Sequence, residues 1–298
     1  MKVLISGATG LVGGALAASL SKDDHEIFSL TRSPQGDRDI GWNPGQGEID
    51  VEKLAGFDAV VHLAGESIAE GRWTAAKKHR IRESRVLGTK LLSESLAGLD
   101  TRPRVFVSAS AIGYYGDQGD KELGEDGPTG ELFLSEVCRD WEAAAEPARQ
   151  AGIRVVHPRI GVVLSKDGGA LAKMLTPFKL GLGGRVGGGR QWMSWISLED
   201  LVGVLRFLIS EDSLSGPVNA VAPKPVTNLE FTKTLGRVLG RPTIFPMPAL
   251  MARLALGEMA DELLLPSTRV KPAKLKSAGY AFRHPQLDGA LRAVLGMG

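Results

Sequence analysis

Residues 3–13, VLISGATGLVG, predict a strand followed by a glycine turn and the start of a helix. The run VLI is apolar, as expected of a strand that is buried on both faces. Gly7, Gly10 and Gly13 follow at a spacing of G-x-x-G-x-x-G, rather than the G-x-G-x-x-G of the standard dinucleotide fingerprint. An apolar helical pattern begins directly after them. The order of strand, turn and helix is the context that this fingerprint requires.

Each glycine of this turn has a physical role if a pyrophosphate binds there. Gly7 would allow the tight turn, Gly10 would let the backbone approach the phosphates, and Gly13 would let the helix pack closely on the strand. The free N–H groups and the dipole at the helix N-terminus favour negative charge. An ordinary glycine-rich loop between strand and helix is the alternative. The candidate phosphate-binding residues are Gly7, Ala8, Thr9, Gly10, Leu11, Val12 and Gly13.

The end of the second predicted strand, residues 26–30, indicates which dinucleotide would bind. An NAD site usually has Asp or Glu at this point, whereas the 2′-phosphate of NADP requires a cation. Thr31 and Arg32 occupy this strand end, and Arg32 offers planar, bidentate donors. A solvated arginine on a turn is the alternative. The pattern therefore favours NADP(H) over NAD(H), with Thr31 and Arg32 as candidate contacts.

Strands and helices alternate through the first half of the chain. Further apolar strands are predicted at residues 59–63, 104–108 and 154–159, with helices at 74–96 and 132–150. Such alternation favours a parallel sheet that is covered on both faces. We therefore expect an α/β protein with a Rossmann-like, doubly wound parallel sheet.

The length of the chain suggests one main body with an appended lobe. At 298 residues it is long for one domain and short for two large ones. We expect an NADP-binding domain at residues 1–159, from which the chain later returns to the sheet. A smaller substrate lobe follows at 160–298, and it includes a C-terminal extension at about 246–293.

Composition excludes several classes of protein. The chain is 43% apolar and 23% charged, as expected of a globular protein, and a net charge of +2 is too small to indicate nucleic acid binding. The single cysteine, Cys138, excludes an internal disulfide and a zinc cluster. No apolar run approaches the roughly 20 residues needed to cross a bilayer, and no signal peptide is recognised. We expect a cytoplasmic protein with a small-molecule substrate and no nucleic acid, membrane or metal partner, whose oligomeric state stays open.

Several segments together resemble the short-chain dehydrogenase/reductase superfamily in its extended branch, the NAD-dependent epimerase/dehydratase-like family. More narrowly, the chain resembles the subfamily of the bacterial protein YfcH and a mammalian short-chain dehydrogenase of family 39U, which carries a C-terminal extension. In chain order, the matching segments are GATGLVG at 7–13, LAGE at 63–66, GRW at 71–73, GYYG at 113–116, RIGVVL at 159–164, WISLEDL at 195–201, GEM at 257–259 and AGYAFR at 278–283.

The resemblance implies an NADP(H) cofactor and adds cofactor contacts to those above. The segment after the third buried strand would pass the adenosine and bridging ribose, and two arginines stand where the subfamily supplies further contacts. These additional candidates are Leu63, Ala64, Gly65, Glu66, Arg72 and Arg159.

The catalytic residues depart from the pattern of the superfamily. Short-chain dehydrogenases use a serine, a tyrosine and a lysine four residues after the tyrosine, and the lysine helps the tyrosine to exchange a proton. Ser110 aligns with the serine, but Leu134 and Cys138 occupy the tyrosine and lysine positions. Neither residue can replace the dyad, because leucine has no proton to donate and cysteine carries no fixed positive charge. Tyr114 is the first candidate to replace it, and Tyr115, Glu66 and Cys138 are further options.

Four polar side chains have interpretations that need no catalysis. We expect His62 to be a packed core histidine inside its strand, Cys138 to be a small buried hydrophobe and Tyr115 to pack under a loop. Arg85, on the basic helix at 74–96, is expected to face solvent unless it turns inward toward the cofactor.

Two functions stay open from the sequence. The first is an NADP(H)-dependent oxidoreductase or epimerase that acts on a small substrate, supported by the phosphate loop and Ser110. The second is a non-catalytic NADP(H)-binding sensor or interaction protein, supported by Leu134 and Cys138 at the dyad positions.

Overall fold

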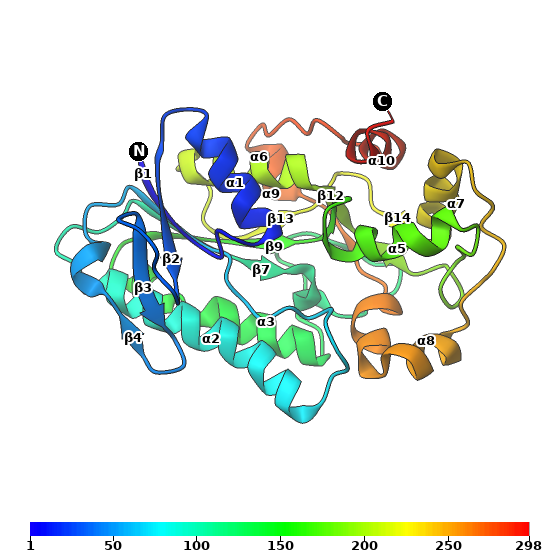
Figure 1. The fold of residues 1–298 in the computed structure, drawn as a ribbon, viewed down its shortest axis with the longest axis horizontal. Coiled ribbons are helices and arrows are strands. Elements are labelled where there is room, and N and C mark those ends of the chain that lie inside the picture. The colour runs from blue at the N-terminus through cyan, green and yellow to red at the C-terminus, as the bar shows by residue number, and fades with distance from the viewer. Residues whose placement is uncertain (298) are drawn as a thin grey trace.

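A nine-stranded sheet forms the middle layer of the protein, of which the computed structural model describes residues 1–297 (Figure 1). Neighbouring strands are parallel except for an antiparallel pair, β3 and β4, at one edge. In spatial order the strands are β13 (Gly216–Ala220), β9 (Arg154–Ile160), β6 (Val105–Ser108), β5 (Ala59–His62), β1 (Lys2–Ser6), β2 (Glu26–Thr31), β3 (Asp39–Asn43) and β4 (Glu48–Ile49), and β7 (Ser110–Ala111) pairs with β9.

The strand order reverses direction at β1. From β1 the chain builds outward through β2 and β3, and it then returns to the other side of β1 to build β5, β6 and β9. This arrangement confirms the predicted Rossmann-like, doubly wound parallel sheet. Ligands of such sheets bind beyond the carboxyl ends of the strands at the point of reversal, which here lies between β1 and β5.

Helices cover both faces of the sheet (Figure 1). Val3 and Ile5 pack in the core cluster that contains α6, whereas Leu4 between them packs in the opposite cluster with α2. This alternation follows from the two-residue period of a strand, so an unbroken apolar run is what a strand covered on both sides needs. One face carries α1 (Leu11–Ser21) and α6 (Leu198–Ser210), and the other carries α2 (Ala75–Ala97), α3 (Phe133–Ala143) and α4 (Glu146–Gln150).

The helix predicted at 132–150 is in fact two helices, α3 and α4, and this corrects the prediction. Pro147 lies at the start of α4, where its missing N–H and fixed φ are tolerated. Inside one long helix the same proline would remove a hydrogen bond and clash with the preceding turn. The helix predicted at 74–96 is confirmed as α2, and Thr74 caps it by accepting a hydrogen bond from the Lys77 N–H at 3.2 Å.

Beyond the main sheet lies a further hydrophobic core, in which Phe178, Trp195 and Phe231 pack together. Its helices are α5 (Gly169–Lys179), α7 (Asn228–Leu239) and α10 (Leu287–Leu295), and α9 (Ala273–Ser277) lies beside β13. The short strand pairs outside the main sheet are β10 (Val162–Leu164) with β12 (Trp195–Ser197), β11 (Trp192–Met193) with β14 (Val226–Thr227), and β15 (Arg269–Val270) with β8 (Glu122–Leu123).

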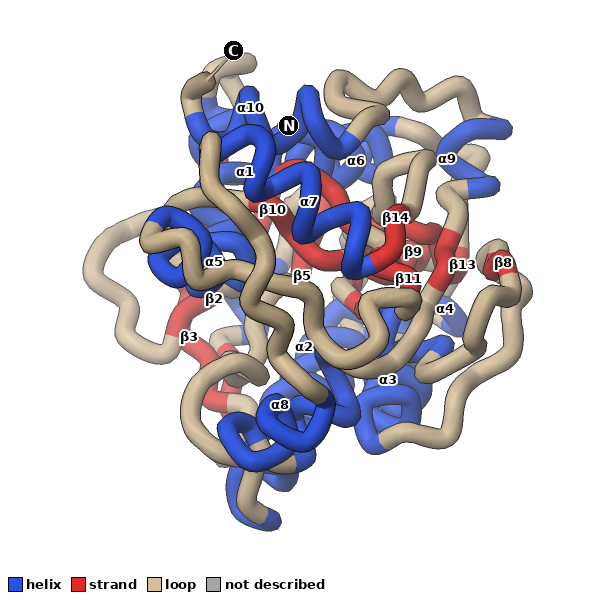
Figure 2. The backbone as a smooth tube through the Cα atoms, turned by 90° about the vertical axis from the view of Figure 1, so that its right-hand side faces the viewer, coloured by secondary structure: helices blue, strands red, loops and turns tan. Residues whose placement is uncertain are grey.

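The C-terminal part of the chain lies against α2 and α3 through α8 (Ala249–Leu256) and the short helix η3 (Ala260–Leu264) (Figure 2). The Glu262 carboxylate accepts the N–H groups of Phe133 and Leu134 at 3.0 Å each, and it therefore caps the N-terminus of α3 from a distant segment. Lys78 and Glu258 form an ion pair at 2.6 Å. Within residues 1–297, no helix is long and apolar enough to span a bilayer.

Candidate cofactor site and active site

The glycine turn between β1 and α1 leaves no room for side chains at two of its positions. Gly7 has φ +72°, and a Cβ there would lie 3.0 Å from the Ala64 nitrogen. A Cβ on Gly13 would lie 2.1 Å from the Gly7 carbonyl oxygen. The turn and the close packing of α1 on β1 therefore both require glycine.

Gly10 differs from these two glycines because it lies at the surface with an extended backbone, which other residues can adopt. It is exposed, and a Cβ there would approach the Gly7 oxygen at 3.2 Å. Gly10 also precedes α1, and no side chain among residues 1–297 caps the free N–H groups of that helix. The turn thus presents uncapped donors and an exposed backbone at the point of strand reversal. These features fit a bound pyrophosphate.

The ends of β1 and β5 are joined beside this turn. The Ser6 hydroxyl accepts the N–H groups of Leu63 at 3.1 Å and Ala64 at 3.2 Å. The segment 63–66 and the glycine turn, which are more than 50 residues apart in the chain, are thereby brought side by side. Because Ser6 pairs with His62 at the carboxyl ends of β1 and β5, the segment 63–66 and the glycine turn both follow strands that end at the same side of the sheet.

Arg32 follows β2, the neighbour of β1. Its side chain is exposed, and within the described residues it has no hydrogen bond or ion pair. Thr31 beside it accepts a hydrogen bond from the Ser33 N–H at 3.3 Å, which shapes the turn. An unengaged guanidinium at this strand end is available to a phosphate group.

Basic side chains of α2 contact the segment 63–66, which follows β5. Glu66 is paired with Lys77 at 2.8 Å, and the hydrogen bond from Lys77 holds the pKa of Glu66 below its usual range. Arg85 does turn inward. Its Nη1 donates to the Glu66 carbonyl oxygen at 3.1 Å, and its guanidinium would lie 3.3 Å from a Cβ on Gly65. Arg85 therefore holds the backbone of this segment in place by a hydrogen bond to Glu66 and by packing against Gly65.

Ser110, Glu142 and Arg159 form a connected buried network. The Ser110 hydroxyl donates to Glu142 Oε1 at 2.7 Å. Arg159 donates to both carboxylate oxygens of Glu142, from Nε at 2.8 Å and from Nη2 at 2.9 Å. The Arg159 side chain is 3% exposed and that of Glu142 is 14% exposed. This bidentate pair fixes the direction in which the serine hydroxyl points.

Two tyrosines surround the same guanidinium in different ways. The Arg159 guanidinium carbon lies 3.5 Å from the centre of the half-buried Tyr114 ring. Tyr115 is fully buried, donates to Asn219 Oδ1 at 2.7 Å and accepts from Arg159 Nη1 at 2.9 Å. Burial raises the pKa of Tyr115, so its hydroxyl stays protonated. Tyr115 packs in the core as predicted, and Tyr114 is the one of the two that reaches toward the surface.

Leu134 and Cys138, at the dyad positions, are core residues of α3. Leu134 Cβ would contact a Cβ on Gly113 at 3.4 Å, and Cys138 is buried with a free thiol. Burial raises the pKa of the Cys138 thiol to about 11, so it carries no negative charge at neutral pH. Cys138 is confirmed as a small buried residue.

Glu142 is the site residue that the sequence reasoning did not select. Leu134, Cys138 and Glu142 are four residues apart, so they lie on one face of α3, which contacts β7 and the turn at 112–115. The residue one helical turn after Cys138, on the same face of the helix, is Glu142, so the spacing of the dyad positions could have located this carboxylate from the sequence.

Arg72 and Arg159 were predicted to contact the cofactor, and the structure gives both of them protein partners. Arg72 donates to the Leu254 carbonyl oxygen of α8 at 2.7 Å, and it ties the loop after β5 to the C-terminal segment. Arg159 also donates to the Glu125 carbonyl oxygen at 3.0 Å, besides its bonds to Glu142 and Tyr115. Their role as cofactor contacts stays a prediction.

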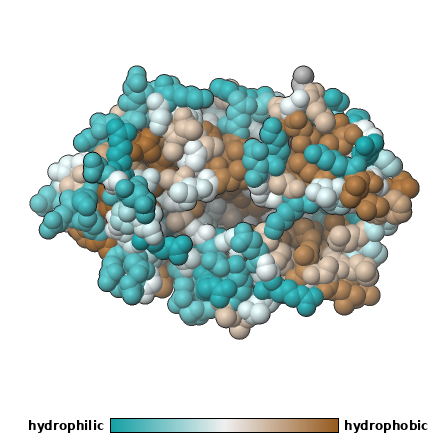
Figure 3. All heavy atoms as spheres, viewed as in Figure 1, coloured by the Kyte–Doolittle hydropathy of each residue, from teal (hydrophilic) through white to brown (hydrophobic). Residues whose placement is uncertain are grey.

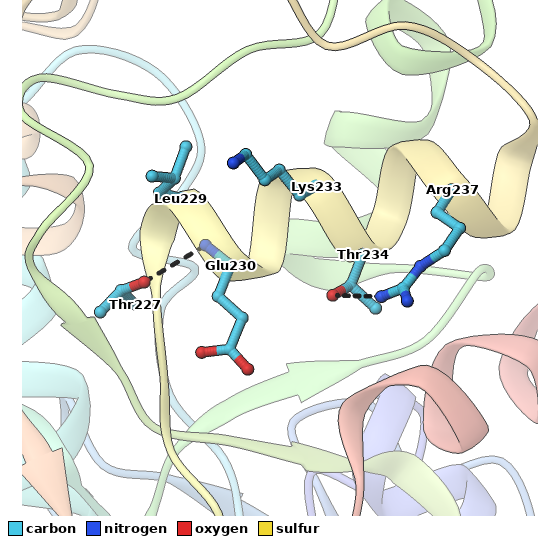
Figure 4. Close-up of a pocket in the computed structure, with 6 residues that line it drawn as sticks. All are labelled: Thr227, Leu229, Glu230, Lys233, Thr234 and Arg237. Atoms are coloured by element: carbon cyan, nitrogen blue, oxygen red, sulfur yellow. Dashed lines mark hydrogen bonds between the residues drawn. The ribbon is translucent and has the colours of Figure 1, made fainter.

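A shallow hollow on α7 lies outside the main sheet (Figure 4). It contains none of the predicted site residues. Its floor is the helix surface, on which Arg237 donates to Thr234 at 3.2 Å. Its lining residues are Thr227, Leu229, Glu230, Lys233, Thr234 and Arg237.

His62 is confirmed as a packed core histidine. It is fully buried, its Nδ1 lies 2.6 Å from Ser6 Oγ, and its ring meets Trp42 edge to face. Burial, with Arg85 nearby, lowers the pKa of His62 from 6.5 to about 4. The imidazole is therefore neutral in the folded protein at pH 7.

The depressed pKa of His62 predicts a loss of stability in mild acid. Between about pH 6.5 and 4 the unfolded chain binds a proton at His62 that the folded protein does not. Stability is therefore fully present above pH 6.5 and falls by about 3 kcal/mol as the pH drops to 4. We expect His62→Asn to flatten this part of a pH series of urea unfolding curves.

His157 is also buried with a lowered pKa, so it makes stability fall in acid in the same direction. The contribution of His62 is therefore the difference between the pH dependence of the parent and that of His62→Asn. Equal slopes in the parent and in His62→Asn would show that His62 does not titrate in this way.

Comparisons with known proteins identify the family of the chain. A sequence model described as the NAD dependent epimerase/dehydratase family matches residues 3–220, and one described as a domain of unknown function, DUF1731, matches 247–294. An epimerase family protein of Mycobacterium tuberculosis is 46% identical over 290 residues, covering 97% of this chain and 96% of that protein. The human epimerase family protein SDR39U1 is 36% identical over 298 residues, covering 99% of this chain and all of the human protein.

Two solved structures are similar over nearly the whole chain. Human SDR39U1, solved with NADPH, has a TM-score of 0.92 at 35% identity and covers 99% of both chains. A nucleoside-diphosphate sugar epimerase of Corynebacterium glutamicum has a TM-score of 0.83 at 38% identity. The match covers 99% of this chain and 58% of that longer chain.

The doubly wound sheet and the open glycine turn at its point of reversal define a Rossmann-type protein of the short-chain dehydrogenase class. Within that class, the chain belongs to the NAD dependent epimerase/dehydratase family, and its relatives include the epimerase family proteins SDR39U1 and YfhF. The family resemblance seen in the sequence is confirmed.

Proposed function

We propose that this protein binds NADP(H) and acts as an oxidoreductase or epimerase on a small substrate, with residues 1–159 as the cofactor domain and 160–298 as the substrate lobe. The observation that carries the proposal is the exposed, uncapped turn at Gly10 beside the unengaged cation of Arg32. Residues 7–13 would hold the pyrophosphate, Thr31 and Arg32 the 2′-phosphate, and 63–66 the adenosine side. NADPH in the human relative supports the choice of cofactor.

The chemistry would take place where the Ser110 network meets Tyr114. The bound nicotinamide supplies or accepts a hydride. Ser110 Oγ, whose own proton is directed to Glu142, has lone pairs free to accept a hydrogen bond from a substrate hydroxyl. Tyr114 would exchange the proton, and the cation stacked on its ring at 3.5 Å stabilises negative charge that develops on the phenol oxygen. Arg159 would thus serve the tyrosine as the lysine does in the usual dyad.

Cofactor preference tests the first half of this proposal. We expect NADPH to bind at least about tenfold more tightly than NADH, because a charge-assisted phosphate contact is worth about 1.5–3 kcal/mol. Arg32→Ala should remove most of the preference in calorimetric titrations with both cofactors. Arg104→Ala is the matched control. Arg104 is exposed and precedes β6, so it lies at the amino ends of the parallel strands, whereas Arg32 follows the carboxyl end of β2. Equal affinity of the parent for NADPH and NADH would rule out the assignment of Arg32.

The role of Tyr114 is tested with a panel of carbonyl and sugar-nucleotide compounds, read out by NADPH oxidation. Tyr114→Phe should lower any turnover found by about 10²- to 10⁴-fold, the usual contribution of general acid–base catalysis, with NADPH affinity nearly unchanged. Ser110→Ala should also lower turnover. Activity that survives both substitutions would show that the chemistry does not depend on Ser110 and Tyr114.

A second function, non-catalytic NADP(H) binding, is favoured by the burial of Leu134 and Cys138. In that case NADPH would raise the melting temperature of the protein by mass action, without turnover of any compound in the panel. The same melting experiment on Tyr114→Phe would then show an unchanged shift.

A further inference from the structure

One end of the molecule exposes a group of large apolar side chains, which we call the apolar end. Four of them are more than three-fifths exposed, namely Ile244 at 72%, Leu180 at 69%, Leu250 at 66% and Leu254 at 61%. Ordinary surfaces carry such residues singly, and a large contiguous group marks an interaction site. The members of the apolar end are Leu180, Leu182, Ile244, Phe245, Met247, Leu250, Met251 and Leu254.

The two chain segments that supply these residues are hydrogen-bonded to each other. The Phe245 N–H donates to the Gly183 oxygen at 3.4 Å, and the Met247 N–H donates to the Arg185 oxygen at 2.8 Å. α8 follows directly and adds Leu250, Met251 and Leu254. The residues therefore form one patch at the end of the long axis where α5 and α8 lie, and Figure 3 shows apolar surface over this end.

The same two segments carry a strong positive charge. Residues 168–191 and 231–257 together contain eight of the 36 Lys and Arg residues of the chain and none of its 34 Asp and Glu residues. All eight are exposed. Arg237 and Arg253 are paired with Asp288 and Asp261, and the other six have no ion pair within residues 1–297. The eight cations are Lys173, Lys179, Arg185, Arg190, Lys233, Arg237, Arg241 and Arg253.

We propose that the apolar end is a docking surface for an anionic lipid bilayer. Cations near a surface of acidic lipids are attracted to it, and protruding leucine, methionine and phenylalanine side chains enter the boundary between headgroups and acyl chains. The chain would lie on the membrane without crossing it. This inference departs from the expectation of no membrane partner that was drawn from the sequence, and it is independent of the proposed cofactor chemistry.

Charge and shape argue against the other occupants. A second copy that docked about a two-fold axis would bring one predominantly basic patch against another, and such like-charge contact is costly. A helix of a protein partner would need a groove to enter. The apolar end instead presents protruding side chains on a loop and a short helix, which a deformable bilayer surface accommodates.

The test is co-sedimentation of the full chain with vesicles. We expect partition onto vesicles of equal parts phosphatidylcholine and phosphatidylglycerol to exceed partition onto phosphatidylcholine alone by at least about tenfold. Binding should weaken as salt rises from about 0.1 M to about 1 M, because the Debye length shortens from about 10 Å to about 3 Å. No sedimentation with the phosphatidylglycerol vesicles at low salt would overturn the proposal.

Matched variants separate the apolar and charged contributions. Leu250→Ser with Leu254→Ser, and separately Lys179→Glu with Arg241→Glu, should each lower partition about tenfold or more. Val51→Ser is the control, because Val51 is 45% exposed on a short helix at the other end of the molecule (Figure 1). NADPH titration of each variant checks that the fold is kept. An equal loss with Val51→Ser would overturn the proposal, as would a parent dimer in light scattering that Leu250→Ser with Leu254→Ser converts to a monomer.

Discussion

Replacement of Gly10 by valine is expected to lower NADPH affinity by about 100-fold or more while the fold stays intact. A Cβ on Gly10 meets the Gly7 oxygen at 3.2 Å, within reach of a small adjustment, so the apoprotein can accept it. The branched side chain would then occupy the space in front of the uncapped N-terminus of α1. Hydrogen bonds to charged groups contribute about 1.5–3 kcal/mol each, so two lost phosphate contacts account for the effect. Calorimetry and circular dichroism measure the two parts of the prediction.

Two other glycines give the controls for this experiment. Gly124→Val makes the same change at a position where the described structure has no atom within 4 Å of a Cβ, and it should leave both affinity and fold unchanged. Gly13→Ala should instead lose folded protein, because its Cβ would lie 2.1 Å from the Gly7 oxygen. NADPH binding by Gly10→Val at the affinity of the parent would mean that the cofactor does not use this turn.

Replacement of Arg159 by methionine is expected to lower the free energy of unfolding by about 3–5 kcal/mol. Arg159 is 3% exposed, and its guanidinium donates two hydrogen bonds to the carboxylate of Glu142, beside the one from Ser110. Removal of one partner leaves a buried charge without compensation, which is far more costly than the net value of the pair. Urea unfolding and the melting temperature measure the loss.

The double variant Arg159→Met with Glu142→Gln isolates this cause. Glutamine can still accept the Ser110 hydrogen bond and carries no charge, so we expect the second substitution to recover most of the lost stability. Glu142→Gln alone should cost less than Arg159→Met. If the two losses simply added, the destabilisation would come from packing around Arg159 and not from the unpaired carboxylate.

The cofactor half of the site could be predicted from the sequence because its signals are local. A buried strand, three glycines at fixed spacing and a helix start lie within residues 3–13, and backbone sterics alone restrict what such a stretch can do. Arg32 was predicted as a cofactor contact for the same reason, since it follows the next strand. The absence of the tyrosine and lysine at Leu134 and Cys138 was equally visible.

The candidate catalytic half depended on contacts between segments that are distant in the chain. Ser110, Glu142 and Arg159 come from β7, α3 and β9, and only the packing of α3 against the end of the sheet brings them within hydrogen-bonding distance. The inward turn of Arg85 and the different surroundings of Tyr114 and Tyr115 were likewise decided by neighbours. The sequence by itself thus determined the class of fold and the glycine turn, because strand and helix periods and glycine sterics act over a few residues. Only the tertiary structure decided which charges are paired, because burial and pairing depend on distances that no local pattern contains.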